Sequence, residues 1–207
     1  MNKTLMIVLI VLIFLADILW QMYRNKKRDA FFNELSHFLA VKDFDAFDKL
    51  IEDKKVKRLF PPYNIAFLKL NEALIKGNAK QIDQAFEQFD GPMNKIQKEA
   101  LYRKAFIYYV EVEDKDKAKN YYDLLKQLNP KDQLSLDATF DTYINKGYRY
   151  LEPSLEEIEK LNEEEKIPYA VLIAEMYRNK KENDKAEEYE KIVSEYTEKL
   201  LKNEGGL

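Results

Sequence analysis

The single histidine, His37, is the side chain best suited to acid–base catalysis or metal binding, but the chain offers it no second histidine as a partner. There is also no cysteine, so neither a thiol nucleophile nor a thiolate zinc site can form. Carboxylates could hold a hard cation, yet no loop has the alternating Asp and Asn residues of a calcium site. We therefore expect His37 to be an ordinary surface residue, and we expect no metal and no cofactor.

The residues that could support nucleophilic catalysis or phosphate binding also lack the required context. The serines are few: Ser36, Ser135, Ser154 and Ser194. None lies in a Gly-x-Ser-x-Gly sequence, and Gly77 and Gly147 stand alone rather than in a phosphate-binding loop. Ser154 follows Pro153, which is typical of a helix start. The sequence thus predicts that the chain is not an enzyme and has no small-molecule substrate.

A long apolar segment lies near the N-terminus. It is unbroken from Leu5 to Ala16, and the span 4–23 would make about 30 Å of helix, which matches the hydrocarbon core of a bilayer. Aromatic residues and a basic cluster follow it, as at a membrane interface. We predict a short tail (1–3), a transmembrane signal-anchor helix (4–23) and a basic juxtamembrane segment (24–28). The side chains assigned to the anchor are Leu5, Ile10, Phe14, Asp17, Trp20 and Tyr23.

A cleaved signal peptide is the alternative to an anchor. It is disfavoured because only Lys3 precedes the apolar run, no small-x-small cleavage site follows it, and the basic cluster lies on the other side. Asp17 has two interpretations: a polar contact with another transmembrane helix, or a side chain that reaches toward the interface. The excess of basic residues after the span predicts a single-pass protein of the cell membrane with its long domain in the cytoplasm.

From residue 29 onward the chain is organised as pairs of amphipathic helices, most clearly in residues 100–130. Two stretches with apolar residues at helical spacing flank the polar turn 113–116. Those apolar residues are Tyr102, Ala105, Phe106 and Tyr109 in the first stretch, and Ala118, Tyr121, Tyr122, Leu125 and Leu128 in the second. Pro130 ends the second helix because proline has no N–H to donate. Neither helix can bury its apolar face alone, so each pair must pack against a neighbour.

This stretch resembles a tetratricopeptide repeat. The matching residues are the aromatic Phe106, Tyr109 and Tyr122, the small Ala118 and the closing Pro130. The positions that follow five expected turns recur at intervals of 35, 36, 37 and 31 residues: Phe47, Ile82, Ala118, Leu155 and Ala186. These intervals bracket the period of the family, which is about 34 residues.

The predicted fold class is therefore all-α. A single N-terminal transmembrane helix is followed by an α-solenoid of about five tetratricopeptide-like hairpins over residues 29–202, with a flexible tail at 203–207. The expected helical pairs are 30–41 with 44–51, 62–75 with 80–89, the pair within 100–130, 132–145 with 153–161, and 167–179 with 184–202.

The resemblance implies a groove that is lined by the first helices of successive pairs and holds a peptide or a partner helix. Alignment to the family pattern gives its lining as Asn33, Ser36, Asn64, Phe67, Asn71, Arg103, Lys104 and Ile107. The asparagines suit an extended backbone, and Arg103 with Lys104 suits a carboxylate. The alternative is that these are ordinary exposed polar residues.

The expected partners are a protein or peptide and the lipid bilayer. Nucleic acid is not expected, because the formal net charge is −3 and the acidic excess lies in residues 152–207. The expected function is that of a membrane-anchored adaptor or scaffold at the cytoplasmic membrane face. Two alternatives stay open: an extracytoplasmic envelope assembly factor or holdase-like chaperone, and a structural subunit of a membrane complex.

Overall fold

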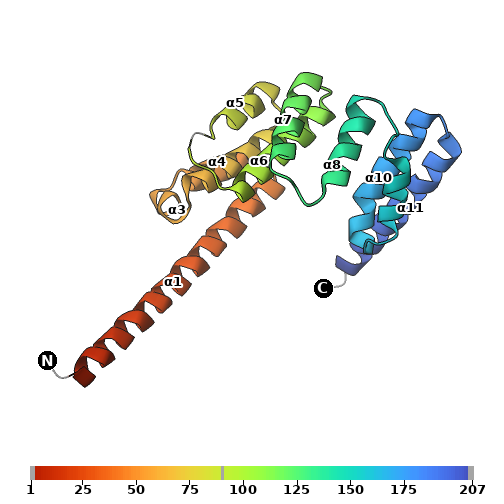
Figure 1. The fold of residues 1–207 in the computed structure, drawn as a ribbon. Coiled ribbons are helices and arrows are strands. Elements are labelled where there is room, and N and C mark those ends of the chain that lie inside the picture. The colour runs from red at the N-terminus through yellow and green to blue at the C-terminus, as the bar shows by residue number, and fades with distance from the viewer. Residues whose placement is uncertain (1–2, 90, 205–207) are drawn as a thin grey trace. The chain divides into compact units, whose positions relative to one another are not determined.

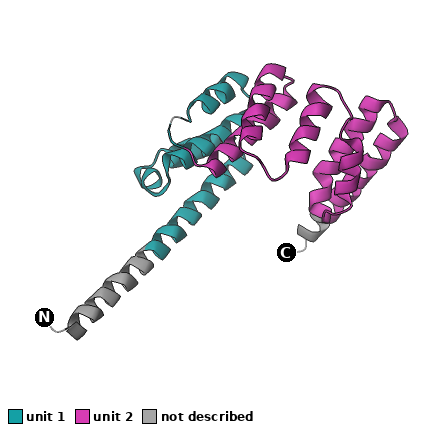
Figure 2. Cartoon of the chain, in the orientation of Figure 1, with its two compact units in different colours: residues 1–92 teal, residues 93–207 magenta. Residues whose placement is uncertain are grey.

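All regular structure in the described part of the chain is helical (Figure 1). The computed structural model describes the backbone of residues 3–89 and 91–204 and the side chains of residues 21–89 and 91–199. No strand occurs among these residues, so the all-α prediction is confirmed. The chain divides into two compact units, residues 1–92 and residues 93–207 (Figure 2).

Each unit is a series of helices. In its described part, unit 1 contains α1 (Lys3–Ala40), α2 (Phe44–Ile51), α3 (Lys54–Leu59), α4 (Pro62–Lys76) and α5 (Ala79–Glu87). Unit 2 contains α6 (Lys95–Glu111), α7 (Lys115–Gln127), α8 (Gln133–Thr139), the π-helical turn η1 (Phe140–Ile144), α9 (Leu151–Ile158), α10 (Glu163–Lys180) and α11 (Asn183–Glu204).

Helix α1 joins three segments that the sequence separates. It runs through the predicted span 4–23, the basic segment 24–28 and the first helix of the domain as one helix of 38 residues. No Gly or Pro interrupts this stretch, and Lys and Arg are good helix formers. The anchor side chains Leu5, Ile10, Phe14, Asp17 and Trp20 lie outside the described residues, and Tyr23 is exposed. Among the described residues, no helix has the length and apolar character needed to cross a membrane.

Consecutive helices contact each other in pairs: α1 with α2, α4 with α5, α6 with α7, α8 with α9, and α10 with α11. These five pairs match the five predicted ones, with local differences. Helix α3 was not predicted, because six residues are too few to show a helical period. Helix α9 begins at Leu151 rather than at Pro153. Helix α10 begins at Glu163 rather than at 167, because Asn162 and Glu165 form a reciprocal capping box.

The chain reverses direction within a pair through a residue in the left-handed region. Lys42, Glu113 and Lys181 have φ of 60°, 55° and 67°, and Gly77 has φ of 70° at the corresponding place after α4. After Lys181, for example, the backbone N–H of Glu182 donates to the Tyr177 carbonyl at 2.9 Å. Lys181 donates its own N–H to the Arg178 carbonyl, also at 2.9 Å. These two bonds form a Schellman motif, which satisfies carbonyls that the helix end leaves unpaired.

The second helix of each pair buries its fourth residue. The buried residues are Phe47, Ile82, Ala118, Ser154 and Ala186. Each donates its backbone N–H to the carbonyl of the residue that precedes its helix, for example Ala118 to Asp114 at 2.9 Å. Ala118 and Ala186 are both buried.

The fourth pair differs from the prediction by one position. Ser154 is fully buried while Leu155 is only half-buried. The expectation that Ser154 lies at a helix start is therefore wrong, because α9 begins three residues earlier. When Ser154 rather than Leu155 is aligned with Phe47, Ile82, Ala118 and Ala186, the intervals between these positions are 35, 36, 36 and 32 residues. This period is more regular than the predicted one.

Unit 1 has its own apolar core. It unites Leu35 and Leu39 of α1, Phe47 and Ile51 of α2, and Val56 of α3 with Phe60 and Leu68 around the start of α4. The short helix α3 is held in this core by Val56, which is fully buried although its four neighbours in the helix, at 54, 55, 57 and 58, are charged and exposed. Helix α3 consequently exposes a basic face to solvent.

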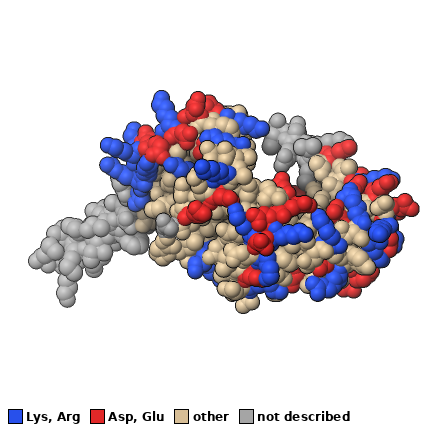
Figure 3. Space-filling view, turned by 90° about the horizontal axis from the view of Figure 1, so that it is seen from above, with Lys and Arg blue, Asp and Glu red and all other residues tan. Residues whose placement is uncertain are grey.

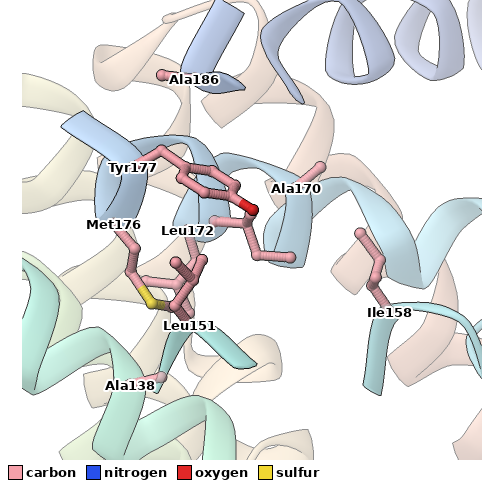
Figure 4. Close-up of a cluster of buried hydrophobic side chains, with 9 residues drawn as sticks. Ala138, Leu151, Ile158, Ala170, Leu172, Met176, Tyr177 and Ala186 are labelled. Carbon is pink, nitrogen blue, oxygen red and sulfur yellow. The ribbon is translucent and has the colours of Figure 1, made fainter. Parts of the chain in front are cut away.

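Unit 2 has two apolar clusters. One joins Phe106 of α6, Leu125 of α7 and Leu136 of α8. The other lies among α8, α9, α10 and α11 (Figure 4). Its buried members are Ala138, Leu151, Ile158, Ala170, Leu172, Ile173, Met176, Tyr177 and Ala186. Because α8 contributes to both clusters, the three first helices α6, α8 and α10 are held in one unit.

Enlarging the buried alanines tests this packing. We expect Ala118→Leu and Ala186→Leu each to lower the free energy of unfolding by about 1–3 kcal/mol, because overpacking a filled site forces side chains off their rotamers. Ala40→Leu is the matched control, since Ala40 is exposed on α1, and its effect should stay within about 0.5 kcal/mol. Chemical denaturation of the full chain in one detergent measures all three. Equal midpoints for the parent and the two core variants would contradict the assigned packing.

Candidate functional site

The predicted groove residues fall into two sets, one in each unit. Unit 1 holds Asn33, Ser36, Asn64, Phe67 and Asn71, and unit 2 holds Arg103, Lys104 and Ile107. Asn33 is exposed and Ser36 is half-buried one turn later on α1. His37, beside Ser36, is also exposed.

The α4 members of the unit 1 set take part in the fold of that unit. The ring of Phe67 stacks on Tyr63, with centroids 5.7 Å apart, and meets Phe89 edge-on at 6.4 Å. Burial raises the pKa of the Tyr63 hydroxyl. Asn64 is exposed in the first turn of α4, while the side-chain oxygen of Asn71 is buried without a hydrogen-bond partner in the described residues. Phe67 therefore packs within its unit, and this set offers few exposed side chains.

The unit 2 set lies on a single face of α6. Arg103 donates two hydrogen bonds to the carboxylate of Asp132, at 2.8 and 2.9 Å, and a longer one to Glu99 at 3.3 Å. Asp132 directly precedes α8. This bidentate pair connects α6 to the start of the next first helix, and such fork-shaped pairs fix geometry as well as charge. The sequence assigned Arg103 to a partner's carboxylate; in this structure two carboxylates of the chain already contact it.

A second polar contact continues from α8 to α10. The hydroxyl of Tyr169 on α10 lies near the Ser135 side chain on α8. Burial, followed by the nearby carboxylates of Glu157 and Asp132, raises the pKa of Tyr169, so this hydroxyl stays protonated at neutral pH. The Arg103–Asp132 and Ser135–Tyr169 contacts together link the three first helices of unit 2.

Large apolar side chains are exposed beside these contacts. Ile96 and Ile107 of α6 are 79% and 55% exposed, and Val171 of α10 is 43% exposed. We define the α6 face as Ile96, Ala100, Arg103, Lys104 and Ile107. Ile96 and Ile107 lie on the same side of the helix about three turns apart, a distance of roughly 16 Å. Lys104 between them is half-buried, and burial lowers its pKa.

Sequence reasoning missed a polar network between α7 and α8. Tyr122 of α7 donates to Asp137 of α8 at 2.7 Å, and Lys126 lies 3.3 Å from the same carboxylate. The ring of Tyr122 also stacks on Phe140 with centroids 4.3 Å apart. Burial and the hydrogen bond to Asp137 raise the pKa of Tyr122. The partners are 15 residues apart in sequence, so no local spacing could have revealed them.

A second missed feature surrounds η1. The buried carboxylate of Asp141 accepts from the backbone N–H of Arg149 at 3.1 Å. A Cβ atom on Gly147 would come within 2.4 Å of that carboxylate, so a larger residue there would force the carboxylate to move. Asn179 of α10 donates to the carbonyls of Thr142 and Gly147, both at 3.0 Å. The loop after η1 is therefore fastened to α10, and this explains the isolated Gly147.

The described side chains contain no group of three or more His, Cys, Asp or Glu residues placed to hold a metal ion. Comparison of the chain with protein-family models, with curated proteins and with solved structures finds no match. The α6 face is therefore the candidate functional site on its geometry alone: two exposed isoleucines that flank a guanidinium and an amine.

A double-mutant cycle tests the bond between α6 and α8. Arg103→Ala and Asp132→Ala should show a coupling energy of about 1 kcal/mol, because the pair is bidentate but partly exposed to solvent. Lys119 and Asp123, an exposed pair on α7 at 2.5 Å, form the control, with an expected coupling of about 0.3–0.5 kcal/mol. Denaturation at low salt measures both cycles. A coupling no larger than that of the control would mean that the Arg103–Asp132 bond does not hold the two helices together.

Proposed function

We propose that the chain is a membrane-anchored, tetratricopeptide-like adaptor that binds a protein or peptide partner at the cytoplasmic membrane face. The observation that carries the proposal is the α6 face, where Ile96 and Ile107 stay exposed on a helix whose other side is buried. Isolated exposed apolar residues are common. Two large ones aligned on one helix face, with basic side chains between them, are the usual anchors of a peptide-binding surface.

The chemistry of this face favours a peptide that carries an acidic group. Arg103 has further N–H donors beyond those that bind Asp132 and Glu99. The bond to Glu99 is the longest of the three, at 3.3 Å, and is the one that a partner's carboxylate would most easily replace. An amphipathic segment would place apolar side chains on the two isoleucines and its acidic group near the guanidinium.

The repeated hairpin supports the tetratricopeptide likeness. Four turns place a left-handed residue directly before the residue that starts the next helix, and all five second helices bury their fourth residue. In a chain of such pairs the apolar faces of the second helices are buried, and faces of the first helices remain available to partners.

The anchor rests on the sequence. The run from Leu5 to Ala16 carries no charge, and α1 continues from it into unit 1 without a break. The basic residues at 24–28 would lie on the cytoplasmic side. A tether of continuous helix would hold the domain close to the bilayer rather than on a flexible linker.

Site-specific photocrosslinking in cells that make the protein tests the proposed surface. A photoreactive residue at Ile96 or Ile107 should give a discrete adduct, whereas one at the exposed Lys119 of α7 should not. In the same chain, Ile107→Asp should reduce the Ile96 adduct about tenfold or more, the effect of losing a central apolar anchor. The stability of unit 2 should not change, because Ile107 is exposed.

Two results would contradict the proposal. Equal adducts at Ile96 and Lys119 would indicate unspecific proximity, and an unchanged Ile96 adduct in the Ile107→Asp variant would move the binding surface elsewhere. Protease treatment of sealed vesicles provides the test of orientation. The domain should be digested only when its cytoplasmic side is accessible, and the opposite result would favour an extracytoplasmic role.

A further inference from the structure

A small polar cleft lies between α1 and α3. It has a volume of about 100 Å³ and is lined by Gln21, Arg24, Asn25, Arg28 and Leu59. Arg24 and Arg28 are four residues apart and therefore lie on the same side of α1. Within the described residues, neither guanidinium has an ion-pair partner. Two like charges at this spacing repel each other unless an anion lies between them.

Helix α3 adds further positive charge beside this cleft. Lys54, Lys55 and Arg58 are exposed, and α3 contacts α1. We call these three residues with Arg24 and Arg28 the basic corner. Figure 3 shows Lys and Arg side chains gathered around the α3 end of unit 1, with a few acidic ones among them.

The acidic residues near the corner do not neutralise it. Glu52 is engaged by Lys57 and by Lys69, the latter at 2.6 Å. These hydrogen bonds lower its pKa to about 2, so it stays ionised and paired. Asp53 accepts the backbone N–H of Lys55 at 2.6 Å as a helix cap. Asp29, beside Arg28, is exposed and has no ion pair within the described residues. The corner keeps a positive excess.

The position of the corner along α1 indicates which anion it meets. Arg24 and Arg28 follow the end of the predicted span by one and five residues, or about 1.5 and 7.5 Å of helix. The headgroup layer of a bilayer leaflet is about 5–8 Å thick. A chain anchored by residues 4–23 would hold the cleft at the depth of the lipid phosphates.

We propose that the basic corner is a docking surface for anionic phospholipid headgroups, with a lipid phosphate held in the cleft between Arg24 and Arg28. The proposal rests on the anchor of the proposed function, since the anchor sets the depth. Nucleic acid also carries phosphates, but the chain is acidic overall, whereas an anchored chain has lipid phosphates beside the corner at all times. Contacts with lipid headgroups would fix the orientation of unit 1 relative to the membrane surface.

A dye on α3 reports this docking in the full chain. The chain has no cysteine, so Lys54→Cys provides a single site for an environment-sensitive fluorophore. The labelled chain is inserted into vesicles of phosphatidylcholine alone or with about 30% phosphatidylserine. We expect emission about twofold higher in the anionic vesicles, and this difference should shrink at about 0.5 M NaCl, where screening is strong.

Paired variants assign the effect to the cleft. Arg24→Gln with Arg28→Gln should abolish the difference between the two vesicle types. Lys80→Gln with Lys95→Gln removes the same charge from exposed positions on α5 and α6 and should leave the difference intact. If both pairs of substitutions reduced the difference in emission equally, the proposal would be overturned. The vesicles would then attract the protein through its total positive charge rather than through the cleft.

The remaining outcomes separate this proposal from the function it rests on. Equal emission in both vesicle types, with the chain resistant to alkaline extraction, would overturn the docking surface and leave the anchor intact. Loss of the chain on alkaline extraction would overturn the anchor itself. If inorganic phosphate or an RNA oligonucleotide raised the dye emission in neutral vesicles as much as phosphatidylserine does, the lipid assignment would be overturned in favour of that ligand.

Discussion

The reversal between the two helices of a pair depends on one backbone conformation. A residue with φ near +60° turns the chain. Its N–H and the N–H of the next residue donate to carbonyls at the end of the first helix, as at Lys181 and Glu182. The residue after the turn residue directly precedes the second helix. The first buried side chain of the second helix is then its fourth residue. The contact between the helices, and therefore the choice of which faces are buried, follows from this turn.

The second helix of each pair buries its apolar face, and the first helices keep an exposed face that can bind other molecules. On α6 that face carries exposed isoleucines around Arg103, and a bidentate bond to Asp132 fixes the guanidinium. Helix α1, the first helix of its pair in unit 1, extends toward the apolar N-terminal segment and carries a basic cleft. One architecture thus supplies a proposed partner surface in unit 2 and a proposed membrane surface in unit 1.

Local patterns in the sequence predicted most of the helices, because helical periods, caps and proline stops are signals within a few residues. They did not predict α3, whose single buried residue, Val56, forms no period. They placed the start of α9 at Pro153, two residues after its actual start at Leu151, because proline is common in the first turn of a helix. The Arg103–Asp132 pair spans 29 residues, and no spacing rule within one helix could reveal it. Exposure of Ile96 and Ile107 likewise depends on which neighbours pack nearby, and the sequence alone carries little of that information.

The left-handed turn is tested most directly by comparing the same substitution in two backbone conformations. Lys181→Gly should raise the free energy of unfolding by about 1 kcal/mol, since glycine adopts φ of 67° without the strain that a side chain adds. Lys191→Gly, within α11, should lower it by about 0.5–1 kcal/mol. Gly77→Ala should also be destabilising, although a Cβ there would meet no atom within 4 Å. Denaturation of the full chain gives all three values. A loss of stability in Lys181→Gly as large as that in Lys191→Gly would contradict the turn on which the hairpins depend.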